Sequence, residues 1–319
     1  MGAEKGPLIV VTEPMTEQSL AYLRQHGRVV QPAAEEVGAA VAEADALVVR
    51  TYTQVTTELL DKARRLKVVG RAGVALENID VPACKAHGIE VVHTPAANTL
   101  AVVDYTIGMI VQLNRRFWPI ARPLTAEEFH RERKQMFGRF LAGATLGIIG
   151  CGRIGSRVGR AAVGLGMKVL YNDIRKIDID CPAQEVDKPT LYGGSDIVTI
   201  HTPLTDLTRR LIDAESLAQF RKGAQFINAA RGPCVDYHAL AAAVRSGRIS
   251  GAAIDCHDPE PPPPDYPMYG LEDRNVILTP HVAARVPAAM DAMCDVVYDV
   301  VAVLQGRAPQ YPAREDQYA

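Results

Sequence analysis

The stretch Leu146-Gly-Ile-Ile-Gly-Cys-Gly-Arg-Ile-Gly155 decides how this chain folds. An apolar run typical of a buried strand leads into the pattern Gly150-x-Gly152-x-x-Gly155, and the residues after it have the apolar spacing of a helix. Gly150 permits a tight turn, Gly152 lets the backbone approach a pyrophosphate, and Gly155 allows helix and strand to pack closely. The helix N-terminus then offers N–H groups and a partial positive charge to phosphates. The stretch therefore predicts a dinucleotide-binding turn.

An acidic residue downstream indicates which dinucleotide this turn binds. The run Lys168-Val-Leu-Tyr-Asn-Asp173 has the composition of a second strand and ends in Asp173, eighteen residues after Gly155. Such an acid accepts hydrogen bonds from the ribose hydroxyls and repels a 2′-phosphate. The sequence therefore favours NAD over NADP, although Arg175, two residues further on, weakens that preference. FAD is an alternative, but FAD-binding chains usually carry this fingerprint at their start, and here it lies near the middle.

Short β-branched runs alternate with helical stretches along the rest of the chain, which is the rhythm of parallel sheets. We count about five strands before residue 95, a long apolar helix over 99–117, and about six strands between 146 and 278. The predicted fold is α/β, a Rossmann-type doubly wound parallel sheet inserted into a smaller flavodoxin-like α/β domain. Several helical stretches stop at a glycine, for which we expect the left-handed cap conformation; these glycines are Gly27, Gly88, Gly166 and Gly247.

The length of 319 residues predicts two domains. A last apolar helix, expected over 286–304, needs a surface to pack on. We therefore expect a discontinuous substrate-binding domain, 1–99 with 284–319, which this helix completes, and an inserted NAD-binding Rossmann domain, 100–283. The chain would cross between the domains near Asn98 and Ala284, and closure about those crossings would exclude water during the reaction.

Composition and charge exclude several classes of partner. The chain is 48% apolar and 23% charged, and 35 basic against 37 acidic residues give a net charge of −2. No global positive field therefore attracts nucleic acid, and no apolar stretch reaches the ~18 residues that span a bilayer. The six cysteines form no C-x-x-C pair, so we expect neither a metal site nor a disulfide framework. A small-molecule partner and a cytoplasmic location are the resulting expectations.

Several motifs that occur in a fixed order make the chain resemble a known family. They are Gly70-Arg-Ala-Gly-Val-Ala-Leu-Glu-Asn-Ile-Asp80, the glycine turn at 150–155, His201-Thr-Pro-Leu-Thr205, Asn228-Ala-Ala-Arg-Gly232, Gly251-Ala-Ala-Ile-Asp255 with Glu260-Pro261, and Thr279-Pro-His-Val282. On these motifs, nearly the whole chain resembles the D-isomer-specific 2-hydroxyacid dehydrogenases, and within them it is most similar to the phosphoglycerate dehydrogenase branch. About fifteen residues follow Leu304, so we expect a short form without the regulatory domain that longer members append.

The resemblance implies a catalytic trio of Arg231, Glu260 and His281. Each follows a predicted strand of the second sheet, and ligands bind at the carboxyl edge of such sheets. His281 would exchange a proton with the substrate 2-hydroxyl while hydride passes between C2 and the nicotinamide, and Glu260 would orient the imidazole and stabilise its charged form. Arg231 would hold the substrate carboxylate and polarise the carbonyl oxygen. Among the other histidines, His201 is expected to line the cofactor site or pack beneath it, and His238 and His257 to be structural or exposed.

The same resemblance implies further contacts with cofactor and substrate. The expected cofactor contacts are Gly150, Gly152, Arg153, Ile154, Gly155, Asp173, Thr202, Pro203, Ala229, Ala230, Asp255 and Ala283. The expected substrate contacts are the backbone N–H groups of Val74 and Ala75, Asn98 near the domain crossing, and, for a phosphorylated substrate, Arg50 and Arg133. Family members usually have glycine where Ala75 stands, and alanine narrows the allowed backbone there. A solvated surface arginine is the equally weighted alternative for both Arg50 and Arg133.

Three further features of the sequence bear on assembly and on the shape of the site. The segment Thr125–Gly138 resembles the arm by which dimers of the family embrace, so we expect a homodimer. Asp104-Tyr105 replaces a Glu-His or Glu-Leu pair, and Cys256-His257 replaces the usual Val-Phe after Asp255. Both departures could reshape the site.

The leading functional hypothesis is an NAD-dependent D-2-hydroxyacid dehydrogenase, with 3-phosphoglycerate as one candidate substrate. One alternative is a glyoxylate or hydroxypyruvate reductase, or a dehydrogenase specialised for another small anionic hydroxy acid. From a different class, an NAD-sensing scaffold of the corepressor type is a weaker alternative, because the trio is intact.

Overall fold

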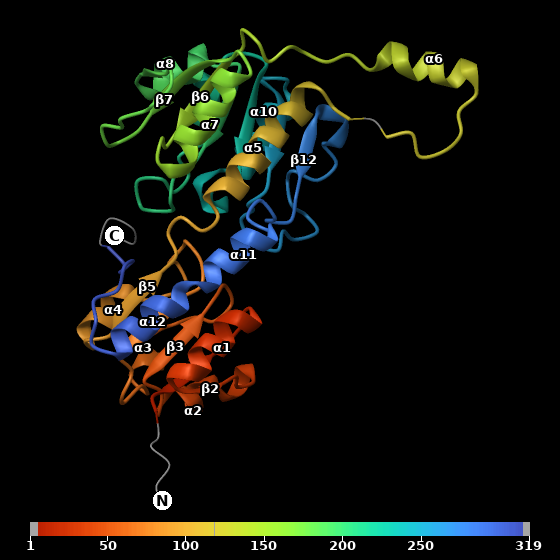
Figure 1. Ribbon diagram of the computed structural model, residues 1–319. Helices are drawn as coiled ribbons and strands as arrows, with labels where there is room; N and C mark the ends of the chain where they lie inside the picture. Colours follow the sequence, from red (N-terminus) through yellow and green to blue (C-terminus); the bar gives the residue numbers. More distant parts are fainter. Residues whose placement is uncertain (1–5, 118, 315–319) are drawn as a thin grey trace, which may run out of the picture. The chain divides into compact units, whose positions relative to one another are not determined.

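The computed structural model describes residues 6–117 and 119–314, which form two compact α/β units (Figure 1). One unit combines the chain up to Asn98 with the chain from Ala284 onward, and the other comprises Thr99–Ala283. None of the helices in these described ranges has the length and apolar character needed to cross a membrane.

The first unit is a five-stranded parallel sheet in the order β2-β1-β3-β4-β5. Its strands are β1 (Leu8–Val11), β2 (Arg28–Val30), β3 (Ala46–Val49), β4 (Val68–Arg71) and β5 (Glu90–His93). Its helices are α1 (Glu17–His26), α2 (Val37–Val41), α3 (Thr57–Leu60), α4 (Val81–Ala86), α11 (Pro287–Cys294) and α12 (Val296–Leu304), with a 3-10 turn at Ala34–Glu36. The four residues of β1 and of β3 are all buried, as expected of strands covered on both faces.

Helix α12 covers one face of this sheet together with α1. Val296, Val297, Val300 and Val301 are buried in one cluster with residues of β1, β3 and β4. The helix comes so close to β4 that a Cβ on Gly70 would lie 2.4 Å from a methyl carbon of Val300. Glycine at this position therefore permits the close packing of the C-terminal helix.

Two local predictions in this unit need correction. The apolar stretch expected as one helix over 286–304 forms α11 and α12, because ψ at Asp295 is −8°, far from the helical value of about −42°. Gly27 does not take the left-handed conformation of a cap, since its φ is −176°. A glycine stands there because a Cβ would lie 2.4 Å from the Pro7 carbonyl oxygen. Gly88, Gly166 and Gly247 do have positive φ angles, of 69°, 79° and 73°.

The second unit contains a seven-stranded parallel sheet in the order β12-β11-β10-β9-β6-β7-β8. Its strands are β6 (Thr145–Ile149), β7 (Lys168–Asn172), β8 (Gln184–Glu185), β9 (Ile197–Ile200), β10 (Ala224–Asn228), β11 (Ile249–Ile254) and β12 (Val276–Leu278). Its helices are α5 (Thr99–Asn114), α6 (Ala126–Gln135), α7 (Arg153–Gly164), α8 (Lys188–Gly194), α9 (Ala214–Gln219) and α10 (Tyr237–Arg245), with 3-10 turns at Gly232–Cys234 and Glu272–Arg274.

The sheet has one strand more than the six or so that the sequence indicates. The additional strand is β8, whose two residues are polar and exposed, so no apolar pattern announces it. All pairings in the sheet are parallel, and the carboxyl ends of β6, β10, β11 and β12 therefore lie along one edge. The predicted glycine turn and the predicted catalytic residues all follow these strands, so the fold directs them to the same edge.

Candidate active site

The glycine turn between β6 and α7 has the backbone of a dinucleotide-binding turn. Gly150 has a φ of +85°, and a Cβ there would lie 2.8 Å from the carbonyl oxygen of His201. A Cβ on Gly155 would lie 2.2 Å from the Gly150 carbonyl oxygen, so only glycine lets the helix start this close to the strand. A Cβ on Gly152 would meet nothing within 4 Å. The space beside Gly152 at the start of α7 is the cradle that a pyrophosphate would fill, so the turn fits the cofactor.

Asp173, directly after β7, is tied to this turn. Its Oδ2 accepts a hydrogen bond from the Cys151 N–H at 2.7 Å, and its Oδ1 accepts one from the Arg175 N–H at 2.9 Å. The carboxylate is thereby fixed beside the first residues of the turn. In that position, it is suited to ribose hydroxyls, which donate hydrogen bonds, and opposed to a 2′-phosphate.

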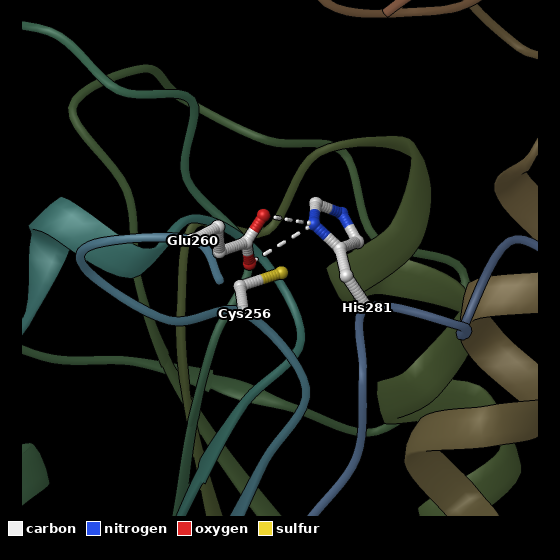
Figure 2. Close-up of side chains that lie close together, drawn as sticks. All are labelled: Cys256, Glu260 and His281. Atoms are coloured by element: carbon white, nitrogen blue, oxygen red, sulfur yellow. Dashed lines mark hydrogen bonds and ion pairs between the residues drawn. The ribbon is translucent and has the colours of Figure 1, made fainter. Parts of the chain in front are cut away.

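His281 and Glu260 form a hydrogen-bonded pair at the carboxyl ends of β12 and β11 (Figure 2). Nδ1 of His281 lies 2.9 Å from Oε2 and 3.1 Å from Oε1 of Glu260. Figure 2 shows the other ring nitrogen of His281 directed away from the carboxylate. With 48% of the His281 side chain and 38% of the Glu260 side chain exposed, the pair is open to a small molecule. This arrangement leaves Nε2 available to exchange a proton with a ligand.

The surroundings of the pair favour a charged imidazolium. The Cys256 side chain and the Glu260 carboxylate together raise the pKa of His281 to about 10, although partial burial acts in the opposite direction. Burial alone would raise the pKa of Glu260, but hydrogen bonds from His281 and from the His257 N–H outweigh it and hold that pKa below its usual value. At neutral pH the site therefore holds an ion pair, with the proton on His281 ready for donation.

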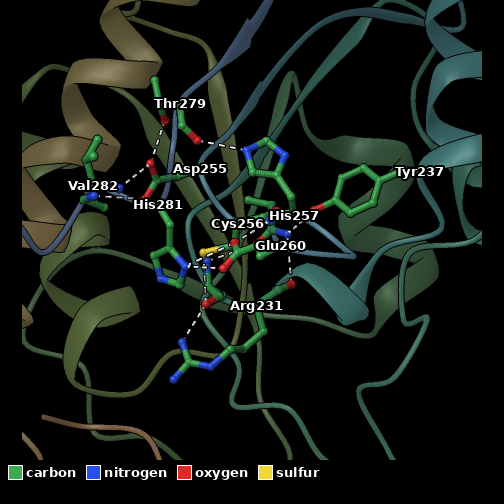
Figure 3. Close-up of polar contacts among 12 residues, drawn as sticks. Arg231, Tyr237, Asp255, Cys256, His257, Glu260, Thr279, His281 and Val282 are labelled. Carbon is green, nitrogen blue, oxygen red and sulfur yellow. Dashed lines mark hydrogen bonds and ion pairs between the residues drawn. The ribbon is translucent and has the colours of Figure 1, made fainter. Parts of the chain in front are cut away.

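Arg231 follows β10, the neighbour of β11 in the sheet. Its Nη1 donates to the Ala230 carbonyl at 2.6 Å, and its own carbonyl accepts from the Asn228 Nδ2 at 3.0 Å. Asn228 Oδ1 in turn accepts from the Ala230 N–H at 2.9 Å, so the loop is held by a side chain from the end of the strand. Figure 3 shows Arg231 at the same edge of the unit as Glu260 and His281.

Asp255 holds the loop on both sides of His281 (Figure 3). The side chain is fully buried, and its carboxylate accepts from the Thr279 hydroxyl at 2.6 Å and from the Val282 and Ala283 N–H groups at 2.9 Å. The Asp255 carbonyl accepts from the His281 N–H at 2.9 Å. His281 has a φ of +51°, a strained conformation for a residue with a side chain, so the loop needs such a clamp. Asp255, predicted as a cofactor contact, is thus engaged within the chain.

The other residues predicted to contact the cofactor lie around the glycine turn and the strand ends. Arg153 and Ile154 are the first residues of α7, and Ala229 and Ala230 are almost fully buried after β10. Thr202 and Pro203 follow β9, where the Pro203 carbonyl accepts from the Thr208 hydroxyl at 2.7 Å. His201, before them, has its Nδ1 buried without a partner, and burial lowers its pKa to about 4. His201 is therefore neutral and packs beneath the turn.

The predicted substrate contacts in the first unit gather on the loops after β3, β4 and β5. Val74 and Ala75 follow β4, and the Val74 carbonyl lies 2.9 Å from Nδ1 of His93, the last residue of β5. Asn98 has a buried Oδ1 without a partner. Arg50 directs its guanidinium to the Pro14 carbonyl at 2.9 Å and to Sδ of Met290 at 3.6 Å.

Arg133 belongs to a different unit from the other predicted substrate contacts. It is an exposed residue of α6, a helix with no buried residue, within the second unit. Nothing within either unit brings Arg50 and Arg133 together.

Sequence reasoning missed Glu13 and left open whether His257 is structural or exposed; both residues hold loops in the structure. The carboxylate of Glu13 accepts hydrogen bonds from four consecutive N–H groups, those of residues 50–53, at 2.8 to 3.2 Å. His257 donates its N–H to Glu260 at 2.8 Å, and its ring lies between the Tyr266 hydroxyl and the Thr279 carbonyl, at 3.1 and 2.9 Å. No motif marks Glu13, because its partners lie 37 to 40 residues away. His257 was expected to be structural or exposed, and it is buried.

The glycine turn and the acid–base pair on one edge of a parallel sheet define a dinucleotide-dependent oxidoreductase. Residues 107–283 match the family model of the D-isomer specific 2-hydroxyacid dehydrogenase, NAD binding domain. The chain belongs to the D-isomer specific 2-hydroxyacid dehydrogenases, and NAD is the cofactor of this family.

Named relatives and a solved structure agree with this assignment. The chain is 38% identical to the hydroxypyruvate reductase of Thermotoga maritima over 80% of its own length and 83% of that protein. It is also 38% identical to the D-3-phosphoglycerate dehydrogenase of Methanocaldococcus jannaschii, over 93% of its own length but only 57% of that protein. The D-lactate dehydrogenase of Aquifex aeolicus, solved with NAD and lactic acid, has a TM-score of 0.78 at 28% identity, covering 94% of this chain and 96% of that one.

Proposed function

We propose that this protein transfers hydride between a D-2-hydroxy acid and NAD, with His281 and Glu260 as the acid–base pair and Arg231 as the residue that binds the substrate. The observation that carries the proposal is the His281–Glu260 pair, bonded at 2.9 Å along the same sheet edge as the glycine turn. An acid–base group beside a dinucleotide turn is what the oxidation of an alcohol requires, since one proton and one hydride leave the substrate.

In this proposal the second unit holds the cofactor. The N–H groups at the start of α7 would bind the pyrophosphate, and Asp173 would accept hydrogen bonds from the adenosine ribose, with NADP as the less favoured dinucleotide. When bound, NAD supplies the acceptor of the hydride. The remaining predicted contacts, including Thr202, Ala230 and Ala283, follow strands of the same edge.

The acid–base work falls to His281. In the reductive direction, Nε2 of the imidazolium would donate its proton to the carbonyl oxygen of the keto acid, and in the oxidative direction the neutral ring would take it back. Glu260 would keep Nδ1 as the donor toward the carboxylate and stabilise the charged ring. The Arg231 guanidinium would hold the substrate carboxylate and attract the charge that develops on the reacting oxygen.

The substrate in this proposal is a small anionic acid that the first unit helps to bind. The backbone at Val74 and Ala75 would donate N–H groups to the carboxylate, and Asn98 has an unpartnered Oδ1 with which to accept a hydrogen bond. Within the first unit, Glu13 holds the loop that carries Arg50 through hydrogen bonds from the N–H groups of residues 50–53. The substrate-binding domain would then be 1–99 with 284–319, and the NAD-binding domain 100–283, closing about Asn98 and Ala284.

A second candidate substrate is 3-phosphoglycerate, supported by the 38% identity to a D-3-phosphoglycerate dehydrogenase. Arg50 and Arg133 are its candidate phosphate contacts. Arg50 is held beside the Pro14 carbonyl, and that contact would have to open for a phosphate. Glyoxylate or hydroxypyruvate is favoured by the fuller coverage of that relative, since the chain covers 83% of the hydroxypyruvate reductase but only 57% of the D-3-phosphoglycerate dehydrogenase.

The test is to follow reduced-cofactor absorbance with a panel of paired D- and L-hydroxy acids and the corresponding keto acids, with NAD and with NADP. We expect turnover of one or more D-acids, a preference for NAD, and loss of turnover in His281→Ala. A D-preference with 3-phosphoglycerate as the best substrate, reduced in Arg50→Ala, would select the second candidate. A folded protein that turns over none of these acids would contradict the enzyme proposal and favour an NAD-sensing scaffold.

We also propose that the protein is a homodimer assembled through the segment around α6. This helix has no buried residue, and the apolar side chains of Phe117, Ile120, Phe137 and Phe140 near it are 63% to 90% exposed. Exposed apolar surface of this kind is typical of a protein–protein interface. Light scattering coupled to gel filtration should give twice the chain mass, and replacing Phe137 and Phe140 by serine should yield the monomer.

We further propose a cytoplasmic location, because the six cysteines are free thiols and the reaction draws on a dinucleotide pool.

A further inference from the structure

Cys256 places a thiol against the acid–base pair, where the family pattern has an apolar residue. The residue lies two positions after the end of β11, and its almost fully buried side chain lies beside Glu260, with the sulfur directed toward His281 (Figure 2). Its Sγ, one carboxylate oxygen of Glu260 and one ring nitrogen of His281 all lie within 4.8 Å of one another. In the mechanism proposed above this thiol neither transfers a proton nor binds the substrate.

Sulfur, imidazole nitrogen and carboxylate oxygen are together the ligand set of zinc. Bonds of about 2.0 to 2.3 Å in a tetrahedral site place the ligand atoms roughly 3.3 to 3.8 Å apart. Atoms that already lie within 4.8 Å of one another reach that spacing by small side-chain rotations. Three protein ligands leave the fourth position for water or for an oxygen of the substrate.

We propose that Cys256, Glu260 and His281 form an inhibitory site for a thiophilic divalent cation of the zinc type. The cation would bind between Nδ1 of His281 and the Glu260 carboxylate, with the Cys256 thiolate as the third ligand. Binding would release the proton from Nδ1 and the proton from the thiol to water. No electron is transferred, and removal of the cation by a chelator restores the free groups.

The cation would inhibit because it takes the place of the proton on Nδ1 of His281. Nδ1 of His281 is the donor in the hydrogen bond to Glu260, at 2.9 Å, and this bond orients the ring. A cation on Nδ1 would turn the ring and block the change of protonation that proton transfer to substrate needs. The open side of the pair, with 48% and 38% of the two side chains exposed, gives a hydrated ion its way in.

Among the six cysteines, Cys256 alone belongs to a group of three candidate ligand side chains within the described residues. Burial raises the pKa of Cys84 and of Cys151 to about 12, which disfavours the thiolate that a cation needs. Cys181 is the most accessible competitor, because it is the one cysteine that is not buried. The variant Cys181→Ser is therefore the matched control.

The experiment measures inhibition by Zn²⁺ and binding of Cd²⁺ in the same set of proteins. We expect Zn²⁺ to inhibit the wild type and Cys181→Ser alike, and chelation to restore the rate. Cys256→Val, which carries the residue usual in the family, should need at least tenfold more Zn²⁺ for half-inhibition of its own rate. Cys256→Ser, similar in volume but a weaker ligand, serves if the valine variant does not fold.

Cadmium reports on the site without any turnover, which matters because the inhibition assay rests on the proposed function. The thiolate-to-cadmium absorption in the ultraviolet should appear with one equivalent in Cys181→Ser, disappear in Cys256→Val, and weaken in Glu260→Gln. A protein without dehydrogenase activity that still gives this band in Cys181→Ser would refute the proposed function but support the site. A band that survives in Cys256→Val, or equal Zn²⁺ sensitivity of Cys256→Val and wild type, would overturn the site.

Discussion

The hydrogen bonds by which Asp255 holds the His281 loop can be tested with the substitution Asp255→Asn. In Asp255→Asn the side chain keeps its size but loses one acceptor oxygen. Oδ1 of Asp255 serves Thr279 and Val282, whereas Oδ2 serves the Ala283 N–H at 2.9 Å. An amide nitrogen at either position would face a donor instead of accepting from it. The substitution therefore leaves a donor on one side of His281 without its partner.

The magnitude follows from these bonds. A buried donor that loses its acceptor costs about 1–3 kcal/mol, and the remaining hydrogen bonds lose the assistance of a charge. Because Asp255 is fully buried, water cannot replace the missing acceptor, and we expect Asp255→Asn to lower the free energy of unfolding by about 2–4 kcal/mol. A displacement of His281 approaching 1 Å would cost up to ~100-fold in rate. We therefore expect kcat to fall about 10-fold to 100-fold, with a smaller change in KM.

The assay combines urea unfolding with steady-state kinetics on the same preparations. Asp265→Asn is the matched control, since Asp265 is an exposed acid that follows the same strand, and it should leave both quantities near the wild-type values. The reasoning would be refuted if the folded Asp255→Asn protein kept the wild-type kcat while its stability fell, because the clamp would then not position His281. An unchanged free energy of unfolding would refute the hydrogen-bond argument itself.

Three further substitutions test the site. Cys256 and Glu260 together raise the pKa of His281 to about 10. In Glu260→Gln the fall of kcat/KM for keto-acid reduction at alkaline pH should therefore begin at lower pH, and a profile with an unchanged alkaline pKa would contradict this. Burial would raise the pKa of Glu13, but four backbone hydrogen bonds outweigh it and lower that pKa. The carboxylate therefore stabilises the folded protein above pH 4.5, the pKa in the unfolded chain, and this contribution disappears as the pH falls through the lower pKa of the folded protein. Glu13→Gln should accordingly lose about 1–3 kcal/mol at neutral pH and less in acid, as urea unfolding at both pH values would reveal; a difference independent of pH would argue against a bound carboxylate. Asp173→Ala should lower the kcat/KM measured with NAD relative to that measured with NADP, and an unchanged ratio would contradict the role of Asp173 in binding the ribose.

The parts of the molecule that could be predicted are those in which the backbone requirement is local. Gly150 and Gly155 are needed by contacts of the turn with its own strand and helix, so their spacing alone indicates the structure. The pairing of Glu260 with His281 was predictable for a related reason: both residues follow neighbouring parallel strands, and such strands end at one edge.

The parts that could not be predicted depend on partners brought together only by the fold. Glu13 accepts hydrogen bonds from residues 37 to 40 positions away, and nothing in its own surroundings marks it. Gly27 follows a helix and so indicates a left-handed cap, but the nearby Pro7 carbonyl, not the cap, is what excludes a side chain there. In both cases local sequence was compatible with several structures, and a tertiary contact selected one.

The end of β11 explains why the chemistry of the site is concentrated in so short a segment. Asp255 fixes the backbone of the His281 loop, Cys256 faces the imidazole, and the N–H of His257 donates to Glu260 at 2.8 Å. Asp255 and Cys256 act through their side chains and His257 through its backbone N–H, so three adjacent residues reach the loop, the ring and the carboxylate separately. The orientation of His281 and the charge state that Glu260 maintains therefore depend on one backbone segment. A substitution at the end of β11 should consequently disturb proton transfer even where it touches neither the substrate nor the cofactor.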